Sequence, residues 1–149
     1  MIFFASILFL VHVYAAPQEQ GADIFDAEDT CLAKYPSLTR EFMENLKLTR
    51  VLPENPTDDF KCFLFCVGKT LSAINHSGEY HFDTLKELTV AVTGGDATHD
   101  DAHAMVSKCI VADHENNCEK AWKYVQCKVE ELQPYKFSKG FCPSCSKKK

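Results

Sequence analysis

Eight cysteines are the residues of this chain most able to do chemistry, because thiols can pair as disulfides, bind metals or attack as nucleophiles. Six follow the spacing C-x30-C-x3-C-x42-C-x8-C-x8-C, and two more lie near the C-terminus. In order, the eight are Cys31, Cys62, Cys66, Cys109, Cys118, Cys127, Cys142 and Cys145. In a short secreted chain such spacing indicates a disulfide framework. We therefore expect oxidised cysteines that do not act as nucleophiles.

Two weaker arrangements could bind a metal or do redox chemistry. His99 and His103 are four residues apart, which could place two ligands on one helix face, but the further ligands of a metal site are not evident. Cys142 and Cys145 form a lone Cys-x-x-Cys, which lacks two zinc ligands and the βαβ context of redox motifs. We expect a local disulfide between these two cysteines, and no metal site, cofactor or catalytic residue.

The first fifteen residues, MIFFASILFLVHVYA, contain no Asp, Glu, Lys or Arg, and their apolar run is too short to span a bilayer. Val13 and Ala15 place small residues before a cleavage site. We expect a signal peptide over residues 1–15 and a secreted, extracellular single domain over 16–149, with a C-terminal tail from about residue 133. No later segment is apolar enough for stable membrane insertion.

The charge pattern argues against two classes of partner. The formal net charge is −5, which gives no electrostatic support to nucleic-acid or anionic-membrane binding. The only basic run, Lys147 to Lys149, is expected to be a solvated terminus. The mature chain of roughly 134 residues is long enough to bury one core.

Apolar residues recur at helical spacing, and no window shows the strict alternation of a half-buried strand. Prolines and a glycine pair separate the segments. Ser37 and Thr57 are suited to cap the second and third helices. The expected helices cover about 23–34, 37–46, 57–67, 82–92, 102–110 and 118–132. The predicted fold class is all-α.

Helical geometry restricts the disulfide pairing without deciding it. Cys62 and Cys66 share a helix face with Cβ atoms about 5–6 Å apart, whereas a disulfide needs about 3.5–4.5 Å. Cys118 and Cys127 are separated by about 13 Å along one helix. Excluding both bonds leaves about ten of the fifteen pairings of six cysteines. The third helix is therefore linked to two different partners.

These features together resemble the insect odorant-binding proteins, including the pheromone-binding group. The resemblance rests on the cysteine spacing, the Cys-x3-Cys on the third helix, the Cys-x8-Cys on the last and the leader, and it extends from Cys31 to about Phe137. It implies a six-helix, disulfide-linked bundle that encloses an apolar ligand cavity. It also implies the pairs Cys31–Cys66, Cys62–Cys118 and Cys109–Cys127. The two extra cysteines and the tail to Lys149 depart from the family pattern.

Apolar residues on the helical faces are candidates for the cavity wall, although each could equally be ordinary core. The expected ligand-binding residues are Phe63, Leu64, Leu71, Ile74, Phe82, Leu88, Met105, Ile110, Trp122, Val125 and Phe137. Phe137 also completes a Pro-x-x-aromatic pattern with Pro134, where the family's tail often lines or covers the pocket. Tyr124 or Ser72 could orient a ligand oxygen.

Two further hypotheses concern the turn at about 75–79. His76 and His81 flank it and could trigger ligand release in acid, since imidazole changes charge near pH 6, or they could be plain surface histidines. Asn75-His-Ser77 is a sequon, so Asn75 is expected to accept a glycan.

The functional prediction is an extracellular carrier that reversibly binds a small hydrophobic molecule without changing it. Its setting would be chemosensation, with a chemoreceptor as a further partner, and it would be a monomer or a homodimer. One alternative is a secreted scavenger or host-interaction protein of saliva, venom or reproductive fluid. Another is a secreted lipolytic enzyme of the phospholipase A2 kind. His99-Asp100 would imitate the catalytic pair of such an enzyme, but the cysteines that should flank the pair and the glycine-rich calcium loop that should precede it are missing.

Overall fold

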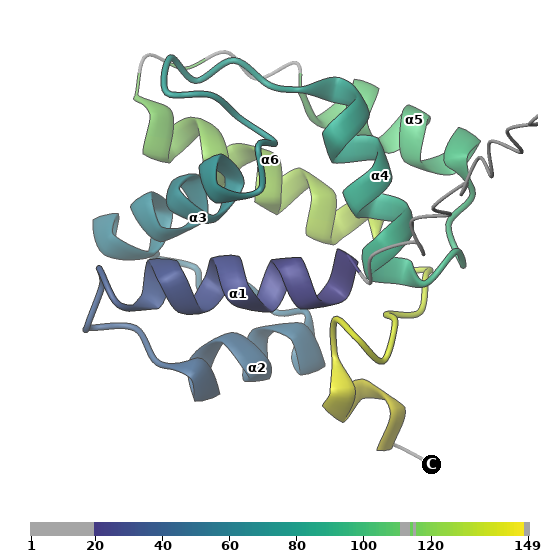
Figure 1. Ribbon diagram of the computed structural model, residues 1–149, viewed down its shortest axis with the longest axis horizontal. Coiled ribbons are helices and arrows are strands. Elements are labelled where there is room, and N and C mark those ends of the chain that lie inside the picture. The colour runs from purple at the N-terminus through teal and green to yellow at the C-terminus, as the bar shows by residue number, and fades with distance from the viewer. Residues whose placement is uncertain (1–19, 111–113, 115, 148–149) are drawn as a thin grey trace, which may run out of the picture.

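The computed structural model describes residues 20–110, 114 and 116–147, so the expected signal peptide lies outside the described residues. It contains six α-helices and one short 3-10 helix (Figure 1). Their bounds are α1 Gln20–Leu32, α2 Arg40–Thr49, α3 Asp58–Thr70, α4 Phe82–Thr93, α5 His99–Cys109, α6 Asn117–Glu131 and η1 Pro143–Lys147. Extended pairing in these ranges is limited to one isolated bridge between Ile74 and Tyr80. The all-α prediction is confirmed.

Capping side chains explain where two of the helices begin. Thr57 accepts a hydrogen bond from the Phe60 amide at 3.2 Å, which confirms it as the cap of α3. The cap of α2 is Thr39 and not Ser37, because a turn after Pro36 delays the helix to Arg40. Ser37 instead donates to the Asp59 carboxylate at 2.7 Å and so links this turn to α3.

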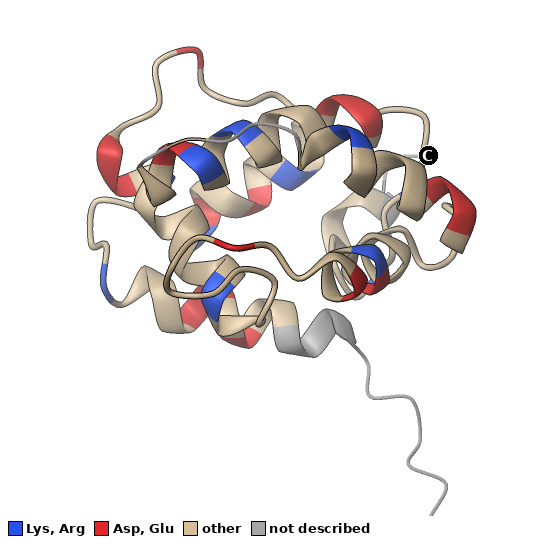
Figure 2. Ribbon diagram, turned by 90° about the horizontal axis from the view of Figure 1, so that it is seen from above, with Lys and Arg blue, Asp and Glu red and all other residues tan. Residues whose placement is uncertain are grey.

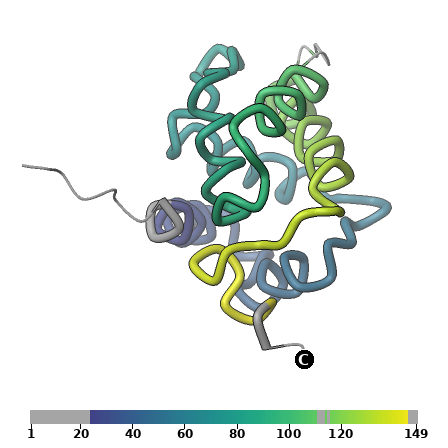
Figure 3. Tube along the Cα trace, turned by 90° about the vertical axis from the view of Figure 1, so that its right-hand side faces the viewer, coloured from purple at the N-terminus to yellow at the C-terminus, as the bar shows by residue number. Residues whose placement is uncertain are grey.

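The helices form two connected groups around the centre of the molecule. α3 packs along α6, and α4 packs along α5 (Figure 1). α1 contacts both α3 and α4, so it bridges the groups. After α6 the chain runs back across the bundle towards α1 and ends beside α2, as the yellow segment in Figure 3 shows. Acidic and basic residues are interspersed along the helices (Figure 2), and none of the described helices is long and apolar enough to cross a membrane.

Disulfides link helices covalently, and Cys109–Cys127 joins the two groups. Cys31–Cys66 links α1 to α3, Cys62–Cys118 links α3 to α6, and Cys109–Cys127 links α5 to α6. These are the pairs that the family resemblance implies, and α3 does have two different partners. The fourth bond, Cys142–Cys145, is local to the C-terminal segment.

The core is divided into three clusters of buried side chains. The first centres on Phe60, Phe63 and Trp122, the second on Val92, Met105 and Leu132, and the third on Leu85, Val106 and Tyr124. Each cluster contributes side chains to the wall of one internal cavity. The centre of the bundle is therefore hollow, with packed core around it.

Candidate ligand-binding cavity

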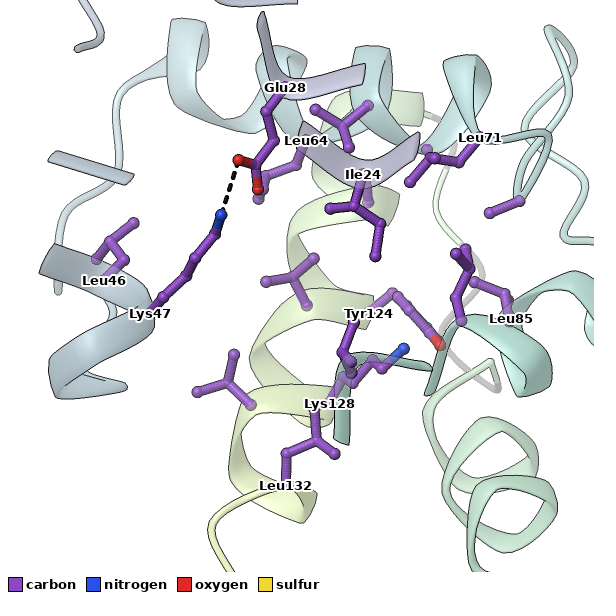
Figure 4. Close-up of a pocket in the computed structure, with 18 of the residues that line it drawn as sticks. Ile24, Glu28, Leu46, Lys47, Leu64, Leu71, Leu85, Tyr124, Lys128 and Leu132 are labelled. Carbon is purple, nitrogen blue, oxygen red and sulfur yellow. Dashed lines mark hydrogen bonds and ion pairs between the residues drawn. The ribbon is translucent and has the colours of Figure 1, made fainter. Parts of the chain in front are cut away.

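The cavity has a volume of about 250 Å³. Its wall comes from α1, α2, α3, α4, α6, the loops near residues 50–52 and 71–80, and the C-terminal segment (Figure 4). Leucine, isoleucine, valine and phenylalanine side chains make up most of it. A cavity of about 150 Å³ with such a lining stays dry and binds benzene. This cavity is large enough for a bigger apolar molecule.

Several of the residues expected from the sequence to bind a ligand do line the cavity. They are Leu64, Leu71, Ile74, Leu88, Val125 and Phe137. They come from α3, the following loop, α4, α6 and the C-terminal segment, so elements far apart in the sequence meet here. Tyr124 also lines the cavity, whereas Ser72 is exposed outside it.

Three expected ligand-binding residues near α5 do not line the cavity. α5 packs on the outer side of α4 and α6 and contributes nothing to the wall. Met105 is therefore buried between α5 and its neighbours, and Ile110 packs beside the third cluster. The Phe82 ring lies 4.9 Å from the His103 ring, so it faces α5. The amphipathic pattern predicts burial correctly, but the buried contacts are with other helices.

Phe63 and Trp122 are also outside the wall, because they fill the first core cluster. Phe63 is fully buried with its ring centre 6.5 Å from that of Tyr35, and Trp122 packs edge-on to Phe60 at 5.8 Å. Phe60 itself reaches the cavity. The sequence analysis therefore selected Phe63 and Trp122, which are core residues, and did not select Phe60, which lines the cavity.

Charged residues of the wall are the main component that the sequence analysis missed. Glu28 on α1 is buried and accepts a hydrogen bond from Lys47 on α2 at 2.8 Å (Figure 4). Arg40 also bonds this carboxylate, and Glu44 lies 3.4 Å from the Lys47 ammonium. The buried charges at this end of the cavity therefore compensate one another. Ion pairs between helices leave no periodic signal in a sequence.

The C-terminal segment closes the cavity next to α2. Arg50 donates to the Leu132 carbonyl at 2.8 Å, and its guanidinium stacks 3.8 Å from the centre of the Phe137 ring. The Phe137 and Phe141 rings meet edge to face at 5.1 Å, and both line the cavity. Phe137, which completes the Pro-x-x-aromatic pattern with Pro134, therefore lines the cavity, although the tail extends further to Lys149.

Two polar groups of the wall make no hydrogen bond within the described part of the chain. The Tyr124 hydroxyl is buried without a hydrogen bond, and burial raises the pKa of Tyr124. The Lys128 ammonium has no carboxylate or hydrogen-bond partner there and lies 5.7 Å from the centre of the Tyr124 ring. Burial disfavours its charged form and lowers the pKa of Lys128 to about 8.

The remaining candidate residues lie away from the cavity wall. His76 and His81 are exposed on either side of the turn, and His99 on α5 lies 3.4 Å from Glu87. Within the described ranges no three His, Cys, Asp or Glu side chains gather where they could hold a metal ion. The Asn75 side chain accepts bonds from the Ser77 and Glu79 amides, and its glycosylation stays a prediction.

Sequence comparison adds an independent line of evidence. Residues 14–131 match the PBP/GOBP family. General odorant-binding protein 19d of Drosophila melanogaster is 30% identical over 139 residues, which cover 91% of this chain and 90% of the relative.

Solved structures of low sequence identity share the fold. Drosophila melanogaster odorant-binding protein dmelOBP28a superposes with a TM-score of 0.63 at 21% identity, covering 78% of this chain and 94% of the other. Locusta migratoria odorant-binding protein lmigOBP1 superposes with a TM-score of 0.59 at 20% identity, covering 76% of this chain and 81% of the other. The fatty acid binding protein OBP56a of the blowfly Phormia regina superposes with a TM-score of 0.55 at 21% identity, covering 80% of this chain and 96% of the other. With its matched sequence, its helices and its framework cysteines in agreement, this chain belongs to the PBP/GOBP family.

Proposed function

We propose that this protein is an extracellular carrier that reversibly holds one small hydrophobic molecule in its central cavity and releases it unchanged. The observation that carries the proposal is the apolar cavity of about 250 Å³ inside a disulfide-linked bundle. The relatives support it, because they are odorant-binding proteins and one binds fatty acids. Removing apolar surface from water gives about 25 cal/mol per Å². Such a wall favours a broad class of apolar ligands.

The chemistry of the wall supports a carrier over a lipolytic enzyme. The cavity-lining part of the described chain contains no histidine, serine, threonine, cysteine or aspartate. The Ser–His, Cys–His or His–Asp pair of a lipolytic site is therefore not available to a bound molecule in this wall. The pair His99-Asp100, which could imitate a phospholipase site, begins α5 on the outside of the bundle.

Secretion and a role in chemosensation are parts of the same proposal. All eight cysteines are oxidised, which is typical of proteins that leave the cytosol. Membership of the odorant-binding family supports a chemosensory setting, and a chemoreceptor would then be the second partner.

A cavity-filling substitution tests the proposal. Val125 lines the cavity from α6, so Val125→Trp should occupy part of its volume. We expect this variant to bind the fluorescent probe N-phenyl-1-naphthylamine at least about tenfold more weakly than the wild type, because about 1.4 kcal/mol of lost contact is tenfold in affinity. The control is Val51→Trp, since Val51 is 68% exposed and outside the wall. Equal probe affinity in all three proteins would overturn the proposal.

A further inference from the structure

The wall of the cavity contains more basic than acidic side chains. Its charged side chains are Glu28, Lys47, Arg50 and Lys128. Glu28 is bonded to Lys47, and Arg50 is bonded to backbone carbonyls at the end of α6. Lys128 is the cation of the wall that has neither a counter-charge nor a hydrogen-bond acceptor among the described residues. A buried charge without a partner is costly unless a bound group compensates it.

The Lys128 side chain is half-buried and points into the interior of the bundle (Figure 4). Its side chain leaves α6 and extends across the cavity towards Leu85 on α4 (Figure 4). Tyr124 is one helical turn earlier on the same face, and its oxygen lies on the same side of α6 as the Lys128 nitrogen (Figure 4). A charged donor and a phenol are thus next to each other on the α6 side of the wall.

We infer that Lys128 is the binding site for the carboxylate of an anionic amphiphile, whose hydrocarbon chain fills the apolar part of the cavity. The inference rests on the proposed carrier function, because it names the class of molecule carried. The uncompensated group is a cation, so the group that complements it is an anion. A carboxylate would form a charge-assisted hydrogen bond with the ammonium. At neutral pH the amine is largely protonated, since its pKa is about 8.

The cavity volume sets the size of a suitable probe. Water-sized groups occupy about 30 Å³ each, so about eight of them fill the 250 Å³ of this cavity. Octanoate therefore matches both the charge and the volume. 1-Octanol has a chain of the same length and no charge, so it reports binding to the apolar wall alone.

The experiment compares the two probes in matched variants by isothermal titration calorimetry at pH 7. Lys128→Met keeps the length of the side chain and removes the charge. We expect it to bind octanoate about tenfold or more weakly than the wild type, which is the range for a lost hydrogen bond to a charged group. Its affinity for 1-octanol should stay the same or increase. Lys128→Arg should retain the preference for octanoate, and Lys123→Met, which alters an exposed lysine of α6, should behave as the wild type.

Each alternative outcome has a separate meaning. If the wild type binds 1-octanol but Lys128→Met binds octanoate just as well, the carboxylate site is wrong and the carrier function stands. If octanal becomes attached to Lys128 after borohydride reduction and octanoate is not preferred, the residue captures aldehydes and the inference is again overturned. If the wild type binds neither octanoate nor 1-octanol, the carrier function itself fails.

Discussion

Glu28 shows how this protein keeps a charge inside an apolar centre. Its carboxylate is buried and bonded to Lys47, and Arg40 bonds it from the partly exposed side. Removing one member of a buried pair leaves the other charge uncompensated and typically costs about 3–5 kcal/mol. The two residues therefore act as a unit that joins α1 to α2.

We predict that Glu28→Leu lowers the free energy of unfolding by about 3 kcal/mol, measured by urea denaturation. Replacing both Glu28 and Lys47 by leucine should recover most of this loss, because no buried charge is then left alone. Asp29→Asn is the control, since its exposed ion pair with Arg40 is worth less than about 1 kcal/mol. An equal loss in Glu28→Leu and Asp29→Asn would contradict the assignment.

Lys128 links the protonation of the cavity to folding. Burial lowers the pKa of Lys128 to about 8, against 10.5 for a solvated lysine. Between these values the unfolded chain binds a proton that the folded chain does not, so the free energy of unfolding rises with pH. We predict a rise of about 1–3 kcal/mol between about pH 8 and about pH 10.

Other ionisable groups face the same cavity and bear on this measurement. They are Glu28 on α1, Lys47 on α2, Arg50 at the C-terminal end of α2, Tyr80 from the loop before α4, and Tyr124 on α6. Burial raises the pKa of Tyr80 to about 12 and also raises that of Tyr124, so both phenols stay neutral in the folded protein over this range. Urea unfolding of Lys128→Met should lack the rise, and Lys123→Met should keep it. A rise of the same size in Lys128→Met would show that another group is responsible.

At the scale of elements, the C-terminal segment is one of the parts of the wall that lie outside the α-helices. Arg50, at the end of α2, holds this segment through the Leu132 carbonyl and the Phe137 ring. The Ser138 amide donates to the Val92 carbonyl on α4 at 2.7 Å. Phe137 and Phe141 then supply its contacts with the cavity. Opening this segment would expose the cavity beside α2.

We predict that replacing Phe137 and Phe141 together by alanine speeds release of N-phenyl-1-naphthylamine about tenfold or more, because each partly buried ring loses apolar contact of about 1 kcal/mol or more. Stopped-flow displacement measures the rate. Lys139→Ala, an exposed change in the same segment, should leave it unaltered. An unchanged rate in the double variant would mean that ligands leave by another route.

The helices themselves could be predicted from the sequence because periodicity, caps and breakers act locally. α4 begins at Phe82, as expected, and Gly94 ends it in a left-handed conformation that glycine adopts readily. Thr39 was missed as a cap because a turn through Pro36, closed by the Leu38 amide on the Tyr35 carbonyl, delays α2, and Ser37 bonds Asp59 instead.

The cavity wall was harder to predict, because an apolar stripe indicates burial without saying what covers it. Leu88 and Met105 both lie on such stripes, yet Leu88 faces the cavity and Met105 faces core. The difference depends on α5 lying outside α4, which only the packing of the whole bundle decides. Lys128 was missed for another reason, since a lysine in a helix is normally solvated.

At the scale of the whole molecule, the disulfides offset the cost of a hollow centre. An empty void costs roughly 24 cal/mol per Å³, so a cavity of this size forfeits several kcal/mol. The chain-entropy estimate gives each framework disulfide about 3–4 kcal/mol. A bundle with these bonds can therefore keep space open between ligands.

We predict that a framework disulfide contributes more to the free energy of unfolding than the disulfide of the C-terminal tail. Replacing both Cys62 and Cys118 by serine removes a bond across 56 residues and should cost about 4 kcal/mol. The same change at Cys142 and Cys145 removes a bond across 3 residues and should cost about 2 kcal/mol. Urea unfolding of the two double variants provides the comparison, and a larger loss from the tail pair would refute this view of the framework.

Native mass spectrometry of freshly purified protein, combined with organic extraction and mass analysis of the extract, tests most directly whether the cavity carries a guest. After incubation with 1-octanol and octanoate, we expect a complex with one ligand per chain, recovery of the ligand with its mass unchanged, and a much weaker complex for Val125→Trp. A protein that retains no ligand, or a Val125→Trp variant that retains as much as the wild type, would contradict the account.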